Sequence, residues 1–184
     1  MSPRRVVIIH GYNANPTSHW FAAVADALAS DGIHVDVAEL PDPTSPSLDR
    51  WVATARAAIG EIDEQTVIVA HSLGSITTLR VLAEDRRNLG ALISVAGFDR
   101  PLPSLPKLDA FTVDPPALAP VAARIRRRIV IVSDHDEVVA PDITRDFARR
   151  FDAELVEIQG GGHFRARDGF TVFPALTAII RDVV

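Results

Sequence analysis

Short apolar runs rich in Val and Ile recur at six places along the chain, and most of them lack an alternation of apolar and polar residues. The runs cover residues 6–9, 35–38, 67–70, 91–95, 129–132 and 155–158. A strand with one face in water alternates apolar and polar residues, whereas a run that is apolar throughout is typical of a strand covered on both faces. The pattern therefore predicts six buried β-strands.

Segments with helical spacing separate these strands. Trp20, Val24 and Leu28 recur on one face after Asn15 and Pro16, which predicts a helix that begins with a cap and a first-turn proline. A second helix is predicted after Ser45 and Pro46, with Gly60 at its end. Further helices are predicted over residues 73–84, 141–151 and 173–181.

Strands and helices that alternate in this order predict a parallel sheet joined by right-handed crossovers, with helices on both faces. The expected fold is a three-layer α/β/α sandwich. One segment, residues 97–120, departs from the pattern because its six prolines rule out a long uninterrupted helix. A long loop of this kind in a compact domain is more often functional than not.

Length and composition predict one globular domain over residues 1–184. The chain is 47% hydrophobic and 23% charged, and about 150 residues per domain is usual. Its net charge of -5 argues against a general nucleic-acid-binding surface, which requires concentrated positive charge. The basic run at residues 124–128 is interpreted as a solvated turn that leads into a strand, with an anion or partner contact as the alternative.

Cysteine is absent, so disulfides, thiolate metal sites and a Cys nucleophile are excluded. The apolar stretch near the start stops at His10, which is too short for the core of a signal peptide. No segment approaches the roughly 20 apolar residues of a membrane span. We therefore expect a cytoplasmic enzyme or binding protein with no membrane association.

Polar residues follow four of the predicted strands. Ligands of open parallel sheets bind beyond the carboxyl ends of the strands, so these polar residues should gather at one site. They are His10 to Tyr12 after the first strand, His71 and Ser72 after the third, Asp134 to Asp136 after the fifth, and the sequence GGGHF, residues 160–164, after the sixth.

Ser72 stands where the third strand turns into a helix. Such a sharp turn projects a serine hydroxyl toward a base, at the cost of a strained backbone and a need for small residues two positions away on each side. Those residues are Ala70 and Gly74, where glycine is usual at both positions. The alternative interpretation is that Ser72 only caps the helix that follows, a position that serine favours.

His163 is the preferred base among six histidines. Three glycines precede it and give its loop the freedom to bring the imidazole over the strand ends. His71 should point away from the base position, His10 belongs to the loop that supplies backbone donors, and His19 either lines a pocket or packs elsewhere. The order Ser, Asp, His along the chain matches that of an α/β-hydrolase triad.

Asp136 is the preferred acid, because it can accept the imidazole N–H and stabilise the imidazolium. Asp134 is the alternative, although it could instead tie down the turn. The backbone amide of Leu73, at the start of a helix, and that of Tyr12 are the expected oxyanion donors, with Asn13 as the alternative to Tyr12. We expect no metal and no cofactor, because ligand spacings such as HExxH and a phosphate-binding loop are both missing.

Four motifs in order resemble the small serine hydrolases related to retinoblastoma-binding protein, including the predicted bacterial esterases of that group. The motifs are VVIIHGYNANPTSHW, VIVAHSLGS, SDHDEVVAP and GGGHFRARDGF. The resemblance implies a minimal α/β-hydrolase fold with sheet order 2-1-3-4-5-6, and a triad of Ser72, Asp136 and His163. Members often have proline after the triad aspartate, whereas this chain has Glu137.

These observations predict a serine hydrolase that cleaves a small acyl substrate, an ester, thioester or activated amide, through an acyl-enzyme on Ser72. Because residues 97–120 are too irregular for a large cap domain, the pocket should be shallow. The expected walls are Trp20, Phe98, Leu102, Leu105 and Phe111. The alternatives are a binding module that uses the hydrolase scaffold for a protein partner, since fold alone does not decide function, and an acyltransferase.

Overall fold

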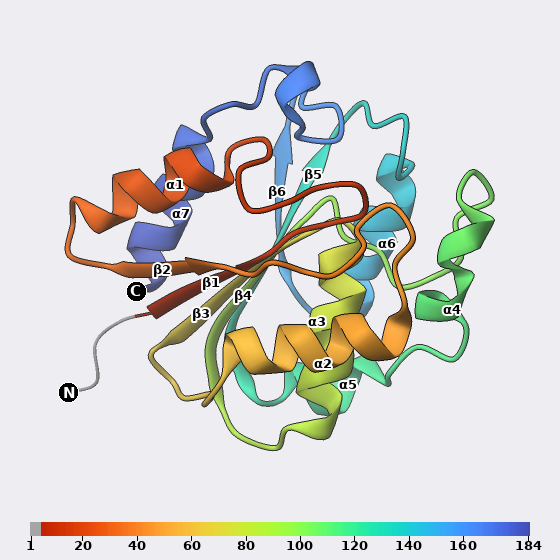
Figure 1. Cartoon of the computed structure of the whole chain (residues 1–184), viewed down its shortest axis with the longest axis horizontal. Helices are drawn as coiled ribbons and strands as arrows, with labels where there is room; N and C mark the ends of the chain where they lie inside the picture. Colours follow the sequence, from red (N-terminus) through yellow and green to blue (C-terminus); the bar gives the residue numbers. More distant parts are fainter. Residues whose placement is uncertain (1–4) are drawn as a thin grey trace.

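Six parallel strands form one twisted sheet between two layers of helices in the computed structural model, which describes residues 5–184 (Figure 1). The strands are β1 (Arg5–Ile9), β2 (His34–Val37), β3 (Thr66–His71), β4 (Leu89–Val95), β5 (Ile125–Ser133) and β6 (Glu154–Ile158). Their order is β2-β1-β3-β4-β5-β6, and every neighbouring pair is parallel. The predicted fold and sheet order are confirmed, while residues 1–4 of the predicted domain lie outside the described part.

Burial along the strands follows their place in the sheet. Every residue of β3 and β4 is buried, because both strands lie inside the sheet with helices over both faces. The edge strands β2 and β6 contain exposed or half-buried residues instead. The unbroken apolar runs of the sequence thus mark the inner strands best.

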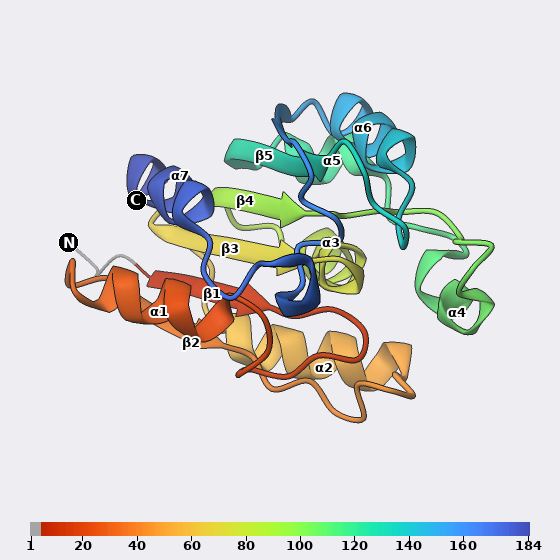
Figure 2. The same cartoon turned by 90° about the horizontal axis from the view of Figure 1, so that it is seen from above.

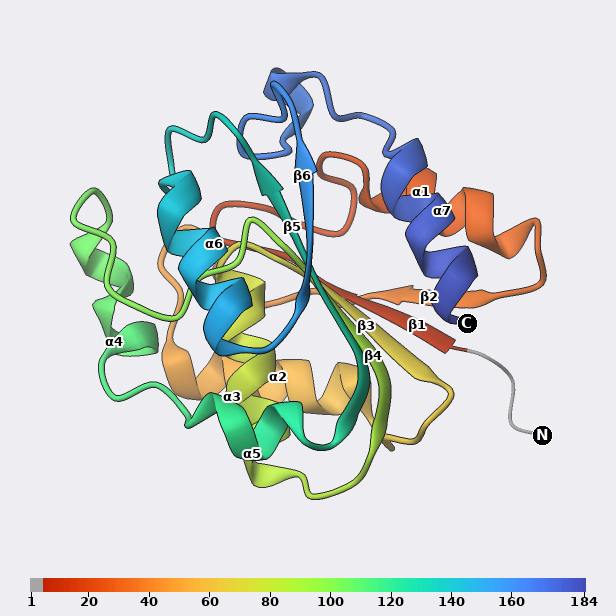
Figure 3. The ribbon, with the colours of Figure 1, turned by 180° about the vertical axis from the view of Figure 1, so that it is seen from behind.

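The helices divide between the two faces of the sheet. Figures 1 and 3 show α1 (Phe21–Ala29) and α7 (Pro174–Val183) on one face, and α2 (Leu48–Ile59), α3 (Leu73–Glu84) and α6 (Pro141–Arg150) on the other. Two hydrophobic clusters correspond to these layers. One contains Trp51 and Phe147, and the other contains Phe21 and Leu176.

The helix predicted after Pro16 begins later than expected, at Phe21. Asn15 does accept hydrogen bonds, but its Oδ1 caps a turn by accepting from the Thr17 amide at 2.9 Å. His19 then adopts a left-handed backbone with φ of 57°, which interrupts the helical path. The cap and proline therefore begin a turn, and this turn carries His19 toward the carboxyl edge of the sheet.

Residues 97–120 contain only short helical turns, as the prolines predict. These are η1 (Pro106–Leu108), α4 (Asp109–Thr112) and α5 (Leu118–Ala122). No large cap covers the sheet in the part of the chain that the structure describes. Within residues 5–184, no helix is long and apolar enough to cross a membrane.

The basic run at residues 124–128 is not a solvated turn, because β5 already begins at Ile125. Its arginines are paired within the fold. Arg124 donates to the carbonyls of Leu82 and Asp85, and Arg128 donates to the carbonyl and carboxylate of Asp152. The run therefore ties the amino ends of the strands to neighbouring loops.

Candidate active site

The predicted site residues meet at the carboxyl edge of the sheet. In Figure 2 the arrows of β1, β3 and β4 all point toward the side on which α4 lies. Ser72 follows β3, Asp136 follows β5, and His163 follows β6. The parallel topology alone brings together three residues that are separated by up to 91 positions.

Ser72 sits in a tight turn between the last residue of β3 and the first residue of α3. Its backbone has φ of 54° and ψ of -121°, a conformation that costs a non-glycine residue about 1–3 kcal/mol. Neighbouring structure holds it there, because the Ser72 amide donates to the Val95 carbonyl of β4 at 2.9 Å. A strained backbone that the surrounding structure holds in place is typical of a functional residue.

Backbone packing around this turn leaves no room for side chains at two positions. A Cβ at Gly74 would lie 2.3 Å from the Ile9 carbonyl oxygen, and one at Gly11 would lie 2.9 Å from the Ser72 Cβ. Glycine is therefore required at both positions. Ala70, on the other side of Ser72, is fully buried in the core, where its methyl group is accommodated.

The Ser72 hydroxyl does not cap α3, although Ser72 occupies the N-cap position. Its Oγ instead lies 2.9 Å from His163 Nε2. His163 Nδ1 lies 2.7 Å from Asp136 Oδ2, and all three residues are buried. The structure thus brings Ser72, His163 and Asp136 into one continuous chain of hydrogen bonds.

This chain of contacts fixes where the imidazole proton lies. The Asp136 carboxylate can only accept, so His163 donates through Nδ1–H and keeps Nε2 free to accept the Ser72 hydroxyl proton. Asp136 is itself held in place, since its Oδ1 accepts the amides of Val138 at 2.8 Å and Val139 at 3.0 Å. A serine in this arrangement can transfer its proton as it attacks a carbonyl.

Asp134 has a different set of contacts. Its Oδ1 accepts the Gly160 amide at 2.6 Å, so it ties the end of β5 to the loop after β6. Asp134 is exposed, whereas Asp136 is 8% exposed and contacts the imidazole. The geometry therefore favours Asp136 as the acid and gives Asp134 the turn-fixing position.

The loop after β1 brings backbone donors beside Ser72. The Asn13 amide donates to the Pro43 carbonyl at 2.8 Å, so it is already occupied. The Leu73 amide belongs to the first turn of α3, whose N–H groups lack partners inside the helix. Because Gly11 approaches Ser72 so closely, the neighbouring Tyr12 amide is the better candidate of the two in this loop.

Three contacts that sequence reasoning missed hold the loop that carries His163. The His163 carbonyl accepts from His71 Nε2 at 2.9 Å, and the His163 amide donates to Asp168 Oδ2 at 3.0 Å. Trp20 Nε1 donates to the Phe164 carbonyl at 3.0 Å. An aspartate five residues after the histidine is the one local signal in the sequence, while the other two partners are distant along the chain.

Burial keeps the other site histidines neutral. It lowers the pKa of His71 well below its usual value, and the nearby His163 lowers it further. Burial also lowers the pKa of His10, whose Nε2 accepts the Leu40 amide at 3.1 Å. The pKa of His19 falls to about 4, through burial first and then through Arg165 and His163.

A cavity of about 440 Å³ opens above Ser72 and His163. Its lining also includes Tyr12, Asn13, His19, Leu105, Leu108, Val138, Arg165 and Arg167. Leu105 is thus the one predicted wall residue in this lining. His19, whose place the sequence left open, lines the cavity too.

The other four predicted wall residues do not line the cavity. Trp20, Phe98, Leu102 and Phe111 are each at most 3% exposed and pack in the two hydrophobic clusters. Apolar side chains next to the strand ends are drawn into the core because burial of a large side chain is worth about 1.5–3 kcal/mol. The cavity wall instead includes half-buried and exposed residues, many of them polar, such as Tyr12, His19 and Arg165.

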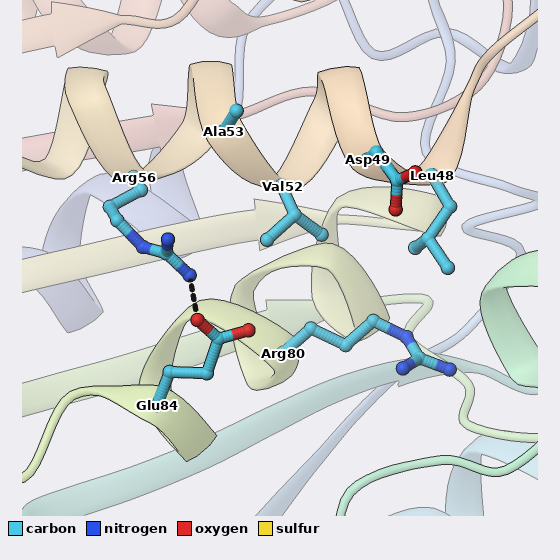
Figure 4. A pocket seen from close by; sticks show the side chains of 7 residues that line it. All are labelled: Leu48, Asp49, Val52, Ala53, Arg56, Arg80 and Glu84. Carbon is cyan, nitrogen blue, oxygen red and sulfur yellow. Dashed lines mark hydrogen bonds and ion pairs between the residues drawn. The ribbon is translucent and has the colours of Figure 1, made fainter.

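A second cavity, of about 210 Å³, lies between α2 and α3 (Figure 4). Both of its arginines are bound within the fold. Arg56 pairs with Glu84, as the dashed line in Figure 4 shows, and Arg80 donates to the Phe111 carbonyl at 2.9 Å and 3.0 Å. Ser72, His163 and Asp136 do not line this groove.

The amino-acid sequence is similar to those of known serine hydrolases. The sequence model of the family described as "Serine hydrolase" matches residues 6–182. The YdeN protein of Bacillus subtilis (strain 168) is 38% identical over 98% of this chain and 94% of its own length. Serine hydrolase RBBP9 of Rattus norvegicus is 24% identical over 100% of this chain and 97% of its own length.

Solved structures agree with the sequence comparison. The crystal structure of the ydeN gene product from B. subtilis superimposes with a TM-score of 0.94, at 37% identity and 98% coverage of both chains. Est1E from Butyrivibrio proteoclasticus superimposes with a TM-score of 0.69 at 16% identity, with 98% of this chain and 88% of that chain covered. The second likeness concerns the fold alone.

Proposed function

The chain belongs to the serine hydrolase family, and we propose that it cleaves small esters, thioesters or activated amides through an acyl-enzyme on Ser72. The observation that carries this proposal is the hydrogen-bonded chain from Ser72 Oγ through His163 to Asp136, with distances of 2.9 Å and 2.7 Å. Each contact lies within the range in which a positioned base can take a proton.

In the first half of the reaction, His163 Nε2 takes the proton of Ser72 as Oγ attacks the substrate carbonyl carbon. Asp136 stabilises the imidazolium that forms, and the amides of Leu73 and Tyr12 stabilise the negative oxygen. The imidazolium then gives its proton to the leaving group, and the acyl group stays on Ser72. Water, activated by the same imidazole, releases the acid and restores the serine.

The cavity supports a small substrate. About 440 Å³ falls in the lower part of the range of ligand pockets, roughly 300–1,000 Å³. Leu105, Leu108 and Val138 give part of its wall an apolar character. Every proton transfer in the sequence above uses side chains of this chain, so the proposal requires no cofactor.

Activity on short-chain nitrophenyl esters tests the proposal. Ser72→Ala should lower kcat by about 10³-fold or more, because removal of a triad nucleophile typically does so. Turnover at the wild-type rate in this variant would exclude Ser72 as the nucleophile. A folded wild-type protein without turnover on any such ester would favour the binding module instead.

A second pair of variants tests the acid. Asp136→Asn should reduce kcat far more than Asp134→Asn, because only Asp136 contacts the imidazole. Asp134→Asn retains an oxygen that can accept the Gly160 amide, and it should therefore act mainly on stability. A larger loss of kcat in Asp134→Asn would reverse the assignment.

A further inference from the structure

The cavity above Ser72 carries charge of the opposite sign to the chain as a whole. The chain has 24 acidic and 19 basic residues, excluding histidine. The cavity lining nevertheless includes Arg165 and Arg167 and contains neither Asp nor Glu. A site enriched in positive charge on an acidic protein attracts anions and repels cations.

Asp168 neutralises only one of the two guanidinium groups. It accepts from Arg165 Nε at 2.9 Å and from Arg165 Nη2 at 3.3 Å, and both side chains are 17% exposed. Burial raises the pKa of Asp168, but the hydrogen bonds from Arg165 outweigh it and lower the pKa to about 2. This carboxylate is therefore charged and committed to Arg165 at every pH at which the protein would be assayed.

Arg167 lines the same cavity without a hydrogen bond to Asp168, so the single carboxylate leaves a net positive charge on the two arginines. Its Nε lies 4.0 Å from Asp168 Oδ1, which is beyond hydrogen-bonding distance, and its side chain is 69% exposed. A guanidinium presents several N–H donors in a planar fork, which suits a carboxylate or phosphate better than a neutral group. Arg167 is thus available to a ligand.

Lys107 adds a second positive charge from another segment. Its Nζ donates to the Tyr12 hydroxyl and lies 4.4 Å from the centre of the Tyr12 ring, which lines the cavity. Across residues 5–184, no carboxylate lies within 4 Å of this ammonium group. Positive charge therefore reaches the cavity from both η1 and η2 (Ala166–Asp168).

His19 contributes a neutral donor to the same lining. Its Nδ1 accepts the Ala166 amide at 3.2 Å, so the imidazole proton is on Nε2. With a pKa of about 4, the ring is neutral at pH 7. The polar groups of the lining thus consist largely of donors, which suit ligand oxygens.

Other arginines of the protein show that this arrangement is specific to the cavity. In the groove between α2 and α3, Arg56 pairs with Glu84 and Arg80 binds carbonyls. At the amino ends of the strands, Arg124 and Arg128 bind carbonyls and a carboxylate. Arg167 is different because it lines the cavity above Ser72 and has no hydrogen-bonded partner of its own among the described residues.

We propose that the natural substrate is an anionic acyl compound, an ester, thioester or amide that carries a carboxylate or similar group, and that Arg167 binds this group. The inference rests on the proposed function, because it assumes that the scissile carbonyl reaches Ser72. The anion binds at the arginine side of the cavity, and a short apolar part of the substrate contacts Leu105, Leu108 and Val138. Arg167 therefore determines specificity and takes no part in proton transfer.

Two matched pairs of esters test the proposal, because the anion can lie on either side of the scissile bond. The acyl pair is mono-4-nitrophenyl adipate and 4-nitrophenyl hexanoate, and the alcohol pair is 4-acetoxybenzoate and its methyl ester. In at least one pair the anionic ester should have a kcat/KM about 10-fold higher, after subtraction of the uncatalysed rate. Added salt should reduce this preference, since an exposed charge is screened.

Arg167→Gln should abolish most of the preference and Arg167→Glu should reverse it, and both variants should change kcat/KM far more on the anionic esters than on the neutral esters. Arg86→Gln, which changes an exposed arginine that lies outside the cavity, is the matched control and should retain the preference. Equal use of the neutral and anionic esters in both pairs, unaffected by Arg167→Glu, would overturn the inference and leave the proposed function standing. Failure of all four esters would instead overturn the proposed function and the inference with it.

Discussion

Ser72 and His163 are brought together by two different kinds of contact. The turn around Ser72 is fixed by backbone packed against backbone, with Gly11 and Gly74 at the points of closest approach. The loop around His163 is fixed by hydrogen bonds, whose side-chain groups come from His71, Trp20 and Asp168. The turn at Ser72 therefore requires residues without side chains, whereas the loop at His163 requires particular side chains that form hydrogen bonds.

This difference determines how each half should respond to substitution. Overpacking of backbone against backbone forces a shift of whole strands, whereas the loss of one of several hydrogen bonds leaves the others in place. Changes at the turn should therefore be severe and affect folding and activity together. Changes at the loop should be graded and should cause smaller losses of both stability and activity.

The largest effect is expected for Gly74→Ala. Its Cβ would lie 2.3 Å from the Ile9 oxygen and 2.7 Å from the His10 oxygen, so β1 and α3 would have to separate. We expect a loss of about 3 kcal/mol in the free energy of unfolding and more than 10-fold in kcat. Urea unfolding followed by intrinsic fluorescence, together with ester kinetics, measures both quantities.

Gly160→Ala is the matched control for that substitution. Gly160 has φ of 66°, and a Cβ added there would have no atom within 4 Å. Alanine at this position would therefore strain the backbone without a steric clash. The expected cost is about 1 kcal/mol. Equal effects of the two substitutions would show that backbone packing does not specify the turn at Ser72.

Asp168→Asn should have the next largest effect. The substitution weakens the acceptor of the His163 amide and leaves Arg165 without its charged partner. We expect kcat to fall about 10-fold on neutral esters, with a loss of about 2 kcal/mol in stability, because hydrogen bonds to charged groups contribute roughly 1.5–3 kcal/mol. Asp142→Asn, at a side chain that is 94% exposed, should change neither quantity.

Trp20→Phe should have a smaller effect, and Trp51→Phe is its counterpart on the other face of the sheet. Both tryptophans are fully buried and donate Nε1–H to a backbone carbonyl, Trp20 to Phe164 and Trp51 to Pro41. Each substitution should cost about 1–2 kcal/mol, because a buried carbonyl at Phe164 or a partly buried one at Pro41 loses its donor. Only Trp20→Phe should lower kcat. An equal fall of kcat in both variants would show that the hydrogen bond from Trp20 to Phe164 has no specific effect on activity.

The last effect concerns the dependence of stability on pH. Burial lowers the pKa of His71 in the folded state, so below about pH 6.5 the unfolded state binds a proton that the folded state does not. Stability should therefore fall as the pH decreases from 7 to 5, by up to about 1.4 kcal/mol per unit for this residue. His71→Gln should flatten the dependence, while His34→Gln, at a side chain that is 65% exposed, should leave it unchanged.

The same contrast explains how much of the molecule the sequence predicts. The strands and the sheet order follow from apolar runs and family resemblance, and the turn at Ser72 is marked by adjacent small residues. Helix α1 begins later than predicted, because an Asn-Pro pair is equally typical of a turn and of a helix start, and here Asn15 and Pro16 form a turn. Short sequence patterns therefore predict those features that depend on residues close together in the chain.

The sequence is less informative about contacts between distant segments. Nothing in the residues around Trp20 indicates that its indole donates to Phe164, 144 positions away, instead of lining the pocket. The apolar character of Phe98 and Phe111 fits a core as well as a pocket wall, and their packing places them in the core. Which apolar residue faces a cavity is decided by tertiary packing alone.

Labelling with a fluorophosphonate probe, followed by peptide mass spectrometry, tests the central claim most directly. A serine reacts with this probe only when a base activates it, so the account predicts one adduct on the peptide that contains Ser72. It also predicts that His163→Ala lowers the labelling rate by at least about 10²-fold. The account would be contradicted by a folded protein that stays unmodified, or by a His163→Ala variant that is labelled at the wild-type rate.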